Sequence, residues 1–301
     1  MKKVIVLGLL SMVLALPMWA KTHTLKGSEQ QKTYDTYKVS AFNVLSVKGQ
    51  IEVEFAQGAS DIYTVSYSGP HNLTERMQII SQDGILSIQY DKPLTVLGDR
   101  HVRVEVSAPD LARIIVQDGA EVHAHVPLAF KELTISGSGK SEVELDDLQA
   151  QFVQVNLTGE SEAEIGVLLC QTLQIQVSEK ASFDAQRTDC DTISSKAQNR
   201  AEVSVTGLNG KTITVENWDS AQTELKGKVN TAALTARGHS EIDAGALQAD
   251  SADVMAERSS HIEVRVSGTL NARTQKRAVV EYKGWPQVIN KTGTGTVKQD
   301  K

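Results

Sequence analysis

The stretch "LTISGSGKSEVEL" (Leu133–Leu145) decides the fold, because nearly the same line returns 20 residues later as "VQVNLTGESEAEI" (Val153–Ile165). In each repeat the second half begins with a small residue, Ala or Ser, which recurs along the chain at intervals of 18 to 21 residues. We use it as the marker of each repeat: Ala120, Ser141, Ser161, Ala181, Ala201, Ala221, Ser240, Ser260 and Ala278. A nearly constant period of this length is typical of a repeat architecture.

Each repeat carries strands with one buried face. The residues two and four positions after the marker are mostly apolar, as in Val143 and Leu145, and the positions between them are mostly polar. Alternation of this kind predicts a half-buried strand, and the abundance of Val, Ile and Thr argues against a helical repeat. Such a short unit cannot enclose a core alone, but stacked copies can. The sequence therefore predicts an all-β fold, a parallel β-helix (solenoid) with coils of about 20 residues, right-handed because parallel connections are strongly biased that way.

The chain divides into five predicted parts. Residues 1–20, "MKKVIVLGLLSMVLALPMWA", have the basic start and short apolar run of a secretory signal peptide, which places the mature protein in the periplasm or outside the cell. Residues 21–35 are polar and are expected to be mobile. Residues 36–110 alternate without the period, which predicts irregular initial β coils that cap the solenoid. Residues 111–290 are the regular solenoid and residues 291–301 a C-terminal tail, with no further apolar run of membrane-spanning length.

The charge of the chain excludes one class of partner. The chain has 31 basic and 37 acidic residues, and loss of the two Lys in residues 1–20 leaves 29 and 37, a formal charge of −8. Binding to nucleic acid needs a basic footprint, so nucleic acid is not an expected partner. Aromatic residues make up only 5% of the chain, which suits thin stacked layers of aliphatic side chains.

Several short segments follow one another in a familiar order. They are "FNVLSVKGQIEVEFAQG" (42–58), "DGILSIQY" (83–90), "VEVSAPDLARIIVQDGAEV" (104–122), the "LTISGSGKSEVEL" stretch and the closing "YKGWPQVINKTGTGTV" (282–297). Over residues 36–298 this order resembles the secreted bacterial family called the putative autotransporter adhesin head GIN domain. The resemblance implies a β-helix and carries the label adhesin, but it brings no catalytic motif. After Gly159 the chain departs from the family pattern, since the Ser-Gly corners become "SEKAS", "QNRAE" and "NWDSA".

Carboxylates recur one and three positions after the marker. Both positions point outward on the same strand, so stacking predicts two parallel acidic ladders. Their members are Glu142, Glu144, Glu162, Glu164, Asp184, Glu202, Glu224, Glu241, Asp243 and Glu263. Stacked like charges destabilise a sheet. Two explanations stay open: a solvated face, which charge runs usually are, or weak binding of Ca²⁺ by oxygen atoms on neighbouring coils.

The segment "EVHAHV" (121–126) adds histidines to the acidic face. Glu121, His123 and His125 alternate along one strand, with Glu142 and Glu144 expected on the next coil. Imidazole and carboxylate groups together can hold a transition metal. Alternating His residues also arise by chance, so these five residues are a candidate metal site only, and no other cofactor is expected.

Cys170 and Cys190 are the only cysteines of the chain, and both lie nine residues after their markers. They should therefore stack on adjacent coils about 4.8 Å apart, which is within the usual Cα range of a disulfide. An oxidising compartment permits the bond. Two buried free thiols are the other possibility, because stacked side chains point in parallel rather than towards each other.

The expected function is binding rather than catalysis. A neutral face beside the acidic one carries Thr134, Ser136, Gln154, Asn156, Gln174, Gln176, Ser194 and Thr214. Rows of polar groups suit a repeating partner: an envelope or extracellular polysaccharide, a protein, or another copy of the chain. The alternative is a carbohydrate-active enzyme, a lyase or hydrolase, acting on a charged glycan. Such enzymes need converging carboxylates, whereas the acids here are spread evenly along the chain.

Overall fold

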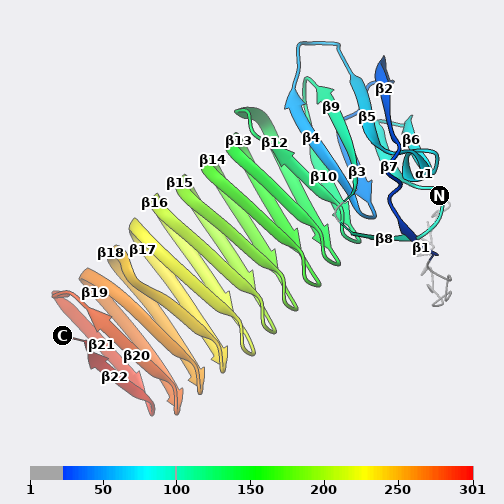
Figure 1. Ribbon diagram of the computed structural model, residues 1–301. Coiled ribbons are helices and arrows are strands. Elements are labelled where there is room, and N and C mark those ends of the chain that lie inside the picture. The colour runs from blue at the N-terminus through cyan, green and yellow to red at the C-terminus, as the bar shows by residue number, and fades with distance from the viewer. Residues whose placement is uncertain (1–22, 99, 301) are drawn as a thin grey trace, which may run out of the picture.

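The computed structural model describes residues 23–98 and 100–300, which form one elongated stack of β-strands (Figure 1). Successive strands lie side by side in chain order from the first regular coils to the C-terminal end. The predicted fold class is confirmed: coils of about 20 residues stack in parallel into a β-solenoid of about nine turns. No helix in these two ranges is long and apolar enough to cross a membrane. The signal peptide predicted for residues 1–20 lies outside the described residues.

Each regular coil is one long, twice-bent strand followed by a tight corner. The strands are β12 (Leu128–Ser138), β13 (Glu142–Leu157), β14 (Glu162–Val177), β15 (Ser182–Ala197), β16 (Glu202–Asn217), β17 (Gln222–Gly238), β18 (Glu241–Arg258) and β19 (His261–Lys276). Between β13 and β15 every paired residue meets the residue 20 positions later, as Val143 meets Ala163. Burial alternates along β13 and shifts by one residue at the two bends, so each coil has three sides.

The corner between coils depends on one residue with positive φ, two positions before the marker. The residues with this conformation, whose φ lies between 57° and 87°, are Asp118, Gly139, Gly159, Glu179, Asn199, Asp219, Gly238, Arg258 and Lys276. From Gly159 onward, the backbone N–H after each corner donates to the corner of the preceding coil, as Glu160 donates to Gly139 at 2.7 Å. Although this conformation favours Gly, the same turn persists at Glu179. The departure from the family pattern after Gly159 thus changes the corner residues and leaves the backbone path unchanged.

The core is a column of aliphatic side chains that runs through the coils. Phe183 is the largest of the fully buried side chains, and its own coil also carries the buried small residues Ala181, Ala185 and Ala197. Protein interiors are close-packed, so the small neighbours make room for one large ring without expanding the coil.

The N-terminal third combines parallel coils with antiparallel strands. Its elements are β1 (His23–Lys26), β2 (Gln31–Lys38), β3 (Val44–Lys48), β4 (Ile51–Gln57), β5 (Thr64–Pro70), α1 (His71–Thr74), β6 (Met77–Gln82), β7 (Ile85–Tyr90), β8 (Leu94–Leu97), β9 (Val102–Ala108), β10 (Arg113–Gln117) and β11 (Glu121–Ala124). β3 pairs in parallel with β10 and β7, and β4 with β11 and β9, so two irregular coils continue the stack. β6 then pairs antiparallel with β7, β5 with β9, and β2 with β5. These strands cover the edge of the first coils, as the capping role predicted for residues 36–110 requires.

The segment for which the sequence predicted mobility, residues 21–35, contains β1 and the first part of β2. β1 pairs in parallel with β8, and β2 pairs with β5 from Gln31 onward. Strands rather than irregular chain therefore occupy much of this segment, because partners distant in the sequence supply their hydrogen bonds.

The C-terminal end closes with a short coil and a charge at an inward position. The coil consists of β20 (Val279–Lys283), β21 (Val288–Gly293) and β22 (Thr296–Gln299), so the predicted tail at 291–301 contributes strands. Lys291 takes the register position of the buried Ala272, with its Nζ 5.0 Å from the Tyr282 ring centroid. It also donates a hydrogen bond to the Val297 carbonyl at 3.3 Å. A side chain stacked in register on Lys291 would have to bury this ammonium group, which is unfavourable and protects the exposed edge.

Candidate functional site

Two rows of carboxylates run along one side of the solenoid. In chain order, the parallel register aligns Glu121, Glu142, Glu162, Ser182, Glu202, Gln222, Glu241 and His261 in the first row, and His123, Glu144, Glu164, Asp184, Ser204, Glu224, Asp243 and Glu263 in the second. Between Glu162 and Asp243 the rows border a shallow groove of about 510 Å³. The acidic residues predicted from the sequence therefore share one surface, with a histidine at one end of each row.

Repulsion within the rows is partly relieved by local partners. Burial, and next the charge of Glu121, raises the pKa of Glu142, while His123 opposes the shift. Further along, the Lys226 ammonium lies 2.5 Å from a carboxylate oxygen of Glu224. The result is a polyanionic surface whose charge is spread along the solenoid. Weak Ca²⁺ binding by these rows stays a prediction.

The structure separates the five residues of the predicted metal site. His123, whose side chain is only 14% exposed, lies between two carboxylates. Its Nδ1 is 3.2 Å from Oε2 of Glu144 on the next coil, and its Nε2 is 3.7 Å from Oε2 of Glu121 on its own strand. Glu142 instead stacks in register on Glu121. One His–carboxylate group thus forms around His123, and His125 belongs to a second group that shares Glu144 with the first.

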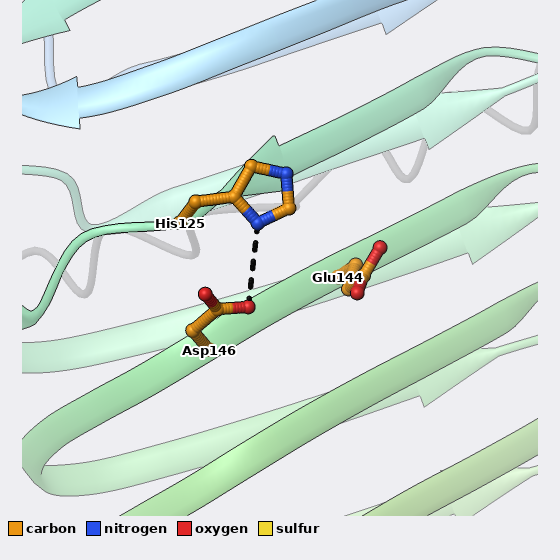
Figure 2. Close-up of side chains that lie close together, drawn as sticks. All are labelled: His125, Glu144 and Asp146. Atoms are coloured by element: carbon orange, nitrogen blue, oxygen red, sulfur yellow. Dashed lines mark hydrogen bonds and ion pairs between the residues drawn. The ribbon is translucent and has the colours of Figure 1, made fainter.

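His125 lies against a carboxylate that the sequence analysis did not include. Its Nδ1 is 3.4 Å from Oδ1 of Asp146, and Figure 2 shows Glu144 beside this pair. One ligand atom from each of the three residues lies within 4.8 Å of the other two. The hydrogen bond with Asp146 raises the pKa of His125. The grouping offers one imidazole nitrogen and two carboxylates from two adjacent coils.

The register of the first regular coils aligns His125 with Asp146. Each lies five residues after its marker, Ala120 or Ser141, and so continues the pairing of the residues before it. The first interval between markers is 21 residues, one more than the next four, and the extra residue falls just after this alignment: three residues of one coil, 125–127, face two of the next, 146–147. An extra residue of this kind bends the strand beside His125. The alignment of the two markers was the signal in the sequence that could have found the third ligand.

The two cysteines lie where the repeat places them. Cys170 and Cys190 are register partners on β14 and β15, and they form a disulfide with a Cα–Cα distance of 4.7 Å. Cys190 is fully buried. The bond joins two adjacent coils on the side that follows the acidic rows.

The neutral face is a pair of rows along β12 to β16. The register stacks Thr134, Gln154, Gln174, Ser194 and Thr214 in one row, and Ser136, Asn156, Gln176, Lys196 and Glu216 in the other. The first row is uncharged throughout these coils, whereas charges enter the second at Lys196 and Glu216. Gln154 Nε2 donates to Asn156 Oδ1 at 3.3 Å, which links the two rows. The first row, which we call the neutral row, is the more uniform surface.

Stacked coils, a closed core and long outward rows define the class of this protein: a β-solenoid with repetitive surfaces. The chain belongs to the family described as putative auto-transporter adhesin, head GIN domain, which matches residues 41–207 and again 173–286. The second match overlaps the first, as a repeated structure permits.

Two crystal structures share the fold of this chain. One, described as a putative adhesin from Parabacteroides merdae, is 17% identical, with a TM-score of 0.55 over 93% of this chain and 100% of that chain. The other, described in the same words, comes from Parabacteroides distasonis and is 21% identical, with a TM-score of 0.53 over 92% of this chain and 100% of that chain. A comparison with curated proteins found no match.

Proposed function

We propose that this chain is a secreted, non-enzymatic binding module of the adhesin type that engages a repeating surface partner, with an envelope or extracellular polysaccharide as the favoured ligand. Membership of an adhesin family supports the binding role. The signal peptide predicted for residues 1–20 supports export to the periplasm or the cell exterior.

The neutral row is the observation that favours a polysaccharide as the ligand. From Thr134 to Thr214 its five members are register partners without an insertion, so uncharged hydrogen-bonding groups recur about every 4.8 Å. A polymer of identical units meets the same groups at each coil, and many weak contacts add up when its units are linked. A protein partner without repeats would meet this row with less regularity, whereas a second copy of the chain has the same coil spacing and is distinguished by the self-association test below.

The acidic rows support a non-enzymatic role. Glycoside cleavage divides the work between two carboxyl groups whose environments push their pKa values apart. In a parallel ladder, neighbouring carboxylates such as Glu144 and Glu164 occupy equivalent positions of equivalent coils. Such repetition along the solenoid suits an extended charged surface better than a single acid–base pair.

Two triple variants test the proposal. Gln154→Ala, Gln174→Ala and Thr214→Ala together remove groups from the neutral row, while Glu142→Lys, Glu162→Lys and Glu202→Lys reverse the first acidic row. Binding to envelope polysaccharide fractions, with circular dichroism to check the fold, should fall at least tenfold in the first triple and persist in the second. The proposal is wrong if one substitution alone abolishes binding in a folded protein, or if only the acidic triple does.

The same glycan fractions also test for catalysis. Incubation with the mature protein should release neither new reducing ends nor unsaturated products. Either product would establish the carbohydrate-active enzyme instead. Capture of an envelope protein, or concentration-dependent self-association lost in the neutral triple, would replace the polysaccharide as ligand.

A further inference from the structure

We propose that His125, Glu144 and Asp146 form a binding site for a transition-metal dication such as Zn²⁺. The proposal is independent of the polysaccharide-binding role, because these residues lie on the acidic side and outside the neutral row. It also differs from the site expected from the sequence, since it contains Asp146 and does not use Glu121, His123 or Glu142 as ligands.

The positions of the three side chains fit one ion. Glu144 and Asp146 are two residues apart on the same coil, and His125 reaches them from the preceding coil. In a tetrahedral site with metal–ligand bonds of about 2.0–2.2 Å, neighbouring ligand atoms are about 3.4 Å apart. His125 Nδ1 and Asp146 Oδ1 are 3.4 Å apart, which is long for a charge-assisted hydrogen bond and matches the edge of such a tetrahedron. A carboxylate oxygen of Glu144 lies within 4.8 Å of both atoms.

The donor set selects the kind of metal. An imidazole with two carboxylates suits Zn²⁺ and neighbouring transition metals, whereas Ca²⁺ prefers six to eight oxygen ligands. With a neutral imidazole, the two carboxylates balance the charge of a dication. His125 and Asp146 are about half exposed, at 54% and 47%, so the ion would keep an open position towards solvent. Three protein ligands and one open position are the pattern of accessible zinc sites.

His123 would act on this site as a positioning residue. Its Nδ1 lies 3.2 Å from one oxygen of Glu144, and its side chain is largely buried, so its ring is held in place. A partner of this kind fixes the orientation of a ligating carboxylate and leaves its other oxygen free. Glu121 in turn lies 3.7 Å from Nε2 of His123.

The far end of the acidic face offers a matched control. His261 also lies between carboxylates, 3.7 Å from Glu241 and 3.5 Å from Glu281. There the Lys298 ammonium group would compete with a metal ion for the carboxylate of Glu281. Its Nζ lies 3.0 Å from Oε1 of Glu281, the oxygen that also faces His261. If a histidine among acids were sufficient, both places would bind metal. The geometry points to His125 alone.

Metal titration of the mature chain without a polyhistidine tag tests the site. Zn²⁺ binding measured by calorimetry should saturate at one ion per chain, and Co²⁺ should give the visible absorption of a tetrahedral site. His125→Ala and Asp146→Asn should each lower Zn²⁺ affinity at least tenfold, whereas His261→Ala should leave it unchanged. The exposed positions of these residues make a folding failure improbable, and melting curves check it. Absence of saturable binding, or an equal loss in His261→Ala, overturns the proposal.

His123 is tested by a pair of substitutions. His123→Ala should weaken Zn²⁺ binding about tenfold and alter the Co²⁺ spectrum, because Glu144 loses its partner. His123→Gln keeps a donor near Glu144 and should restore most of the affinity. A purely structural role would instead lower the melting temperature of both variants and leave the Co²⁺ spectrum unchanged.

Discussion

The regular coils and the N-terminal third face the same physical problem, the exposed edge of a β-sheet, and resolve it in different ways. In the regular coils each edge is paired by the next coil at a spacing of 20 residues, as between β13 and β14. In the N-terminal third, β2, β5 and β6 pair antiparallel with neighbouring strands and cover edges that no further coil pairs. Repetition therefore determines the middle of the solenoid, while its ends need strands that do not repeat.

Removal of the N-terminal third tests this contrast with the largest expected effect. A chain that begins at residue 111 exposes the edges of β10 and β11 that β3 and β4 cover. We expect oligomers or aggregates in light scattering, because open edges pair with other chains.

A shorter truncation supplies the control for this experiment. Removal of residues 21–29 takes away only β1, which pairs with β8 in a separate two-stranded sheet. This chain should keep the oligomeric state of the full mature chain. A chain from residue 111 that also keeps that state and melts cooperatively would show that the antiparallel strands are dispensable.

The next effect is expected within the regular coils, at the largest core side chain. Phe183→Ala should lower the free energy of unfolding by about 3–5 kcal/mol, since the small neighbours in its coil cannot fill the cavity. Denaturant titration measures the loss. Gln174→Ala, an outward change on the preceding coil, should shift the midpoint little. A loss below about 1 kcal/mol for Phe183→Ala would mean that the coils collapse around the cavity.

The sequence predicted most of the regular part for a physical reason. One rule, apolar side chains inward at every second position, operates in each coil, and markers 20 residues apart fix the register. The antiparallel partners of β2 and β6 were not predictable, because these pairings do not repeat. Asp146 could have been predicted from the same register, because it lies five residues after Ser141 just as His125 lies five residues after Ala120, but it lies outside the two acidic rows on which the prediction rested. Sequence periodicity therefore predicts the parts that repeat, including the residues that stack beside a candidate site, and leaves the strands that do not repeat undetermined.

The disulfide tests the stacking of adjacent coils with a smaller effect. The bond joins residues 20 positions apart, so its loss in the double variant Cys170→Ala, Cys190→Ala should cost about 3 kcal/mol through the entropy of the unfolded chain. Reduction of the wild-type protein should give a similar loss. Thiol counting in denaturant without reductant should find no reactive thiol per chain. Two reactive thiols would show that the stacked cysteines remain free.

The smallest effect is expected at the corners, where the family pattern and this chain differ. Glu179 has φ 67° and stacks above Gly159, which has φ 79°. A residue with a Cβ pays about 1–2 kcal/mol in this conformation, whereas Gly adopts it freely but loses more entropy on folding, by about 0.5–1 kcal/mol. Glu179→Gly should therefore raise the free energy of unfolding by about 0.5–1 kcal/mol.

Gly159→Ala is the opposite change at the corner of the preceding coil. A Cβ at this position would lie 2.9 Å from the Gly139 nitrogen and 3.0 Å from its oxygen, so the backbone itself would have to shift. Together with the positive φ, this contact should lower stability by more than about 1 kcal/mol. Opposite signs for the two variants, measured in the same denaturant titration, would show that backbone conformation governs the corners. A loss in both variants would mean that the Glu179 side chain stabilises its corner by more than its backbone strain costs. The non-glycine corners would then be stabilising features of this chain rather than tolerated departures from the family pattern.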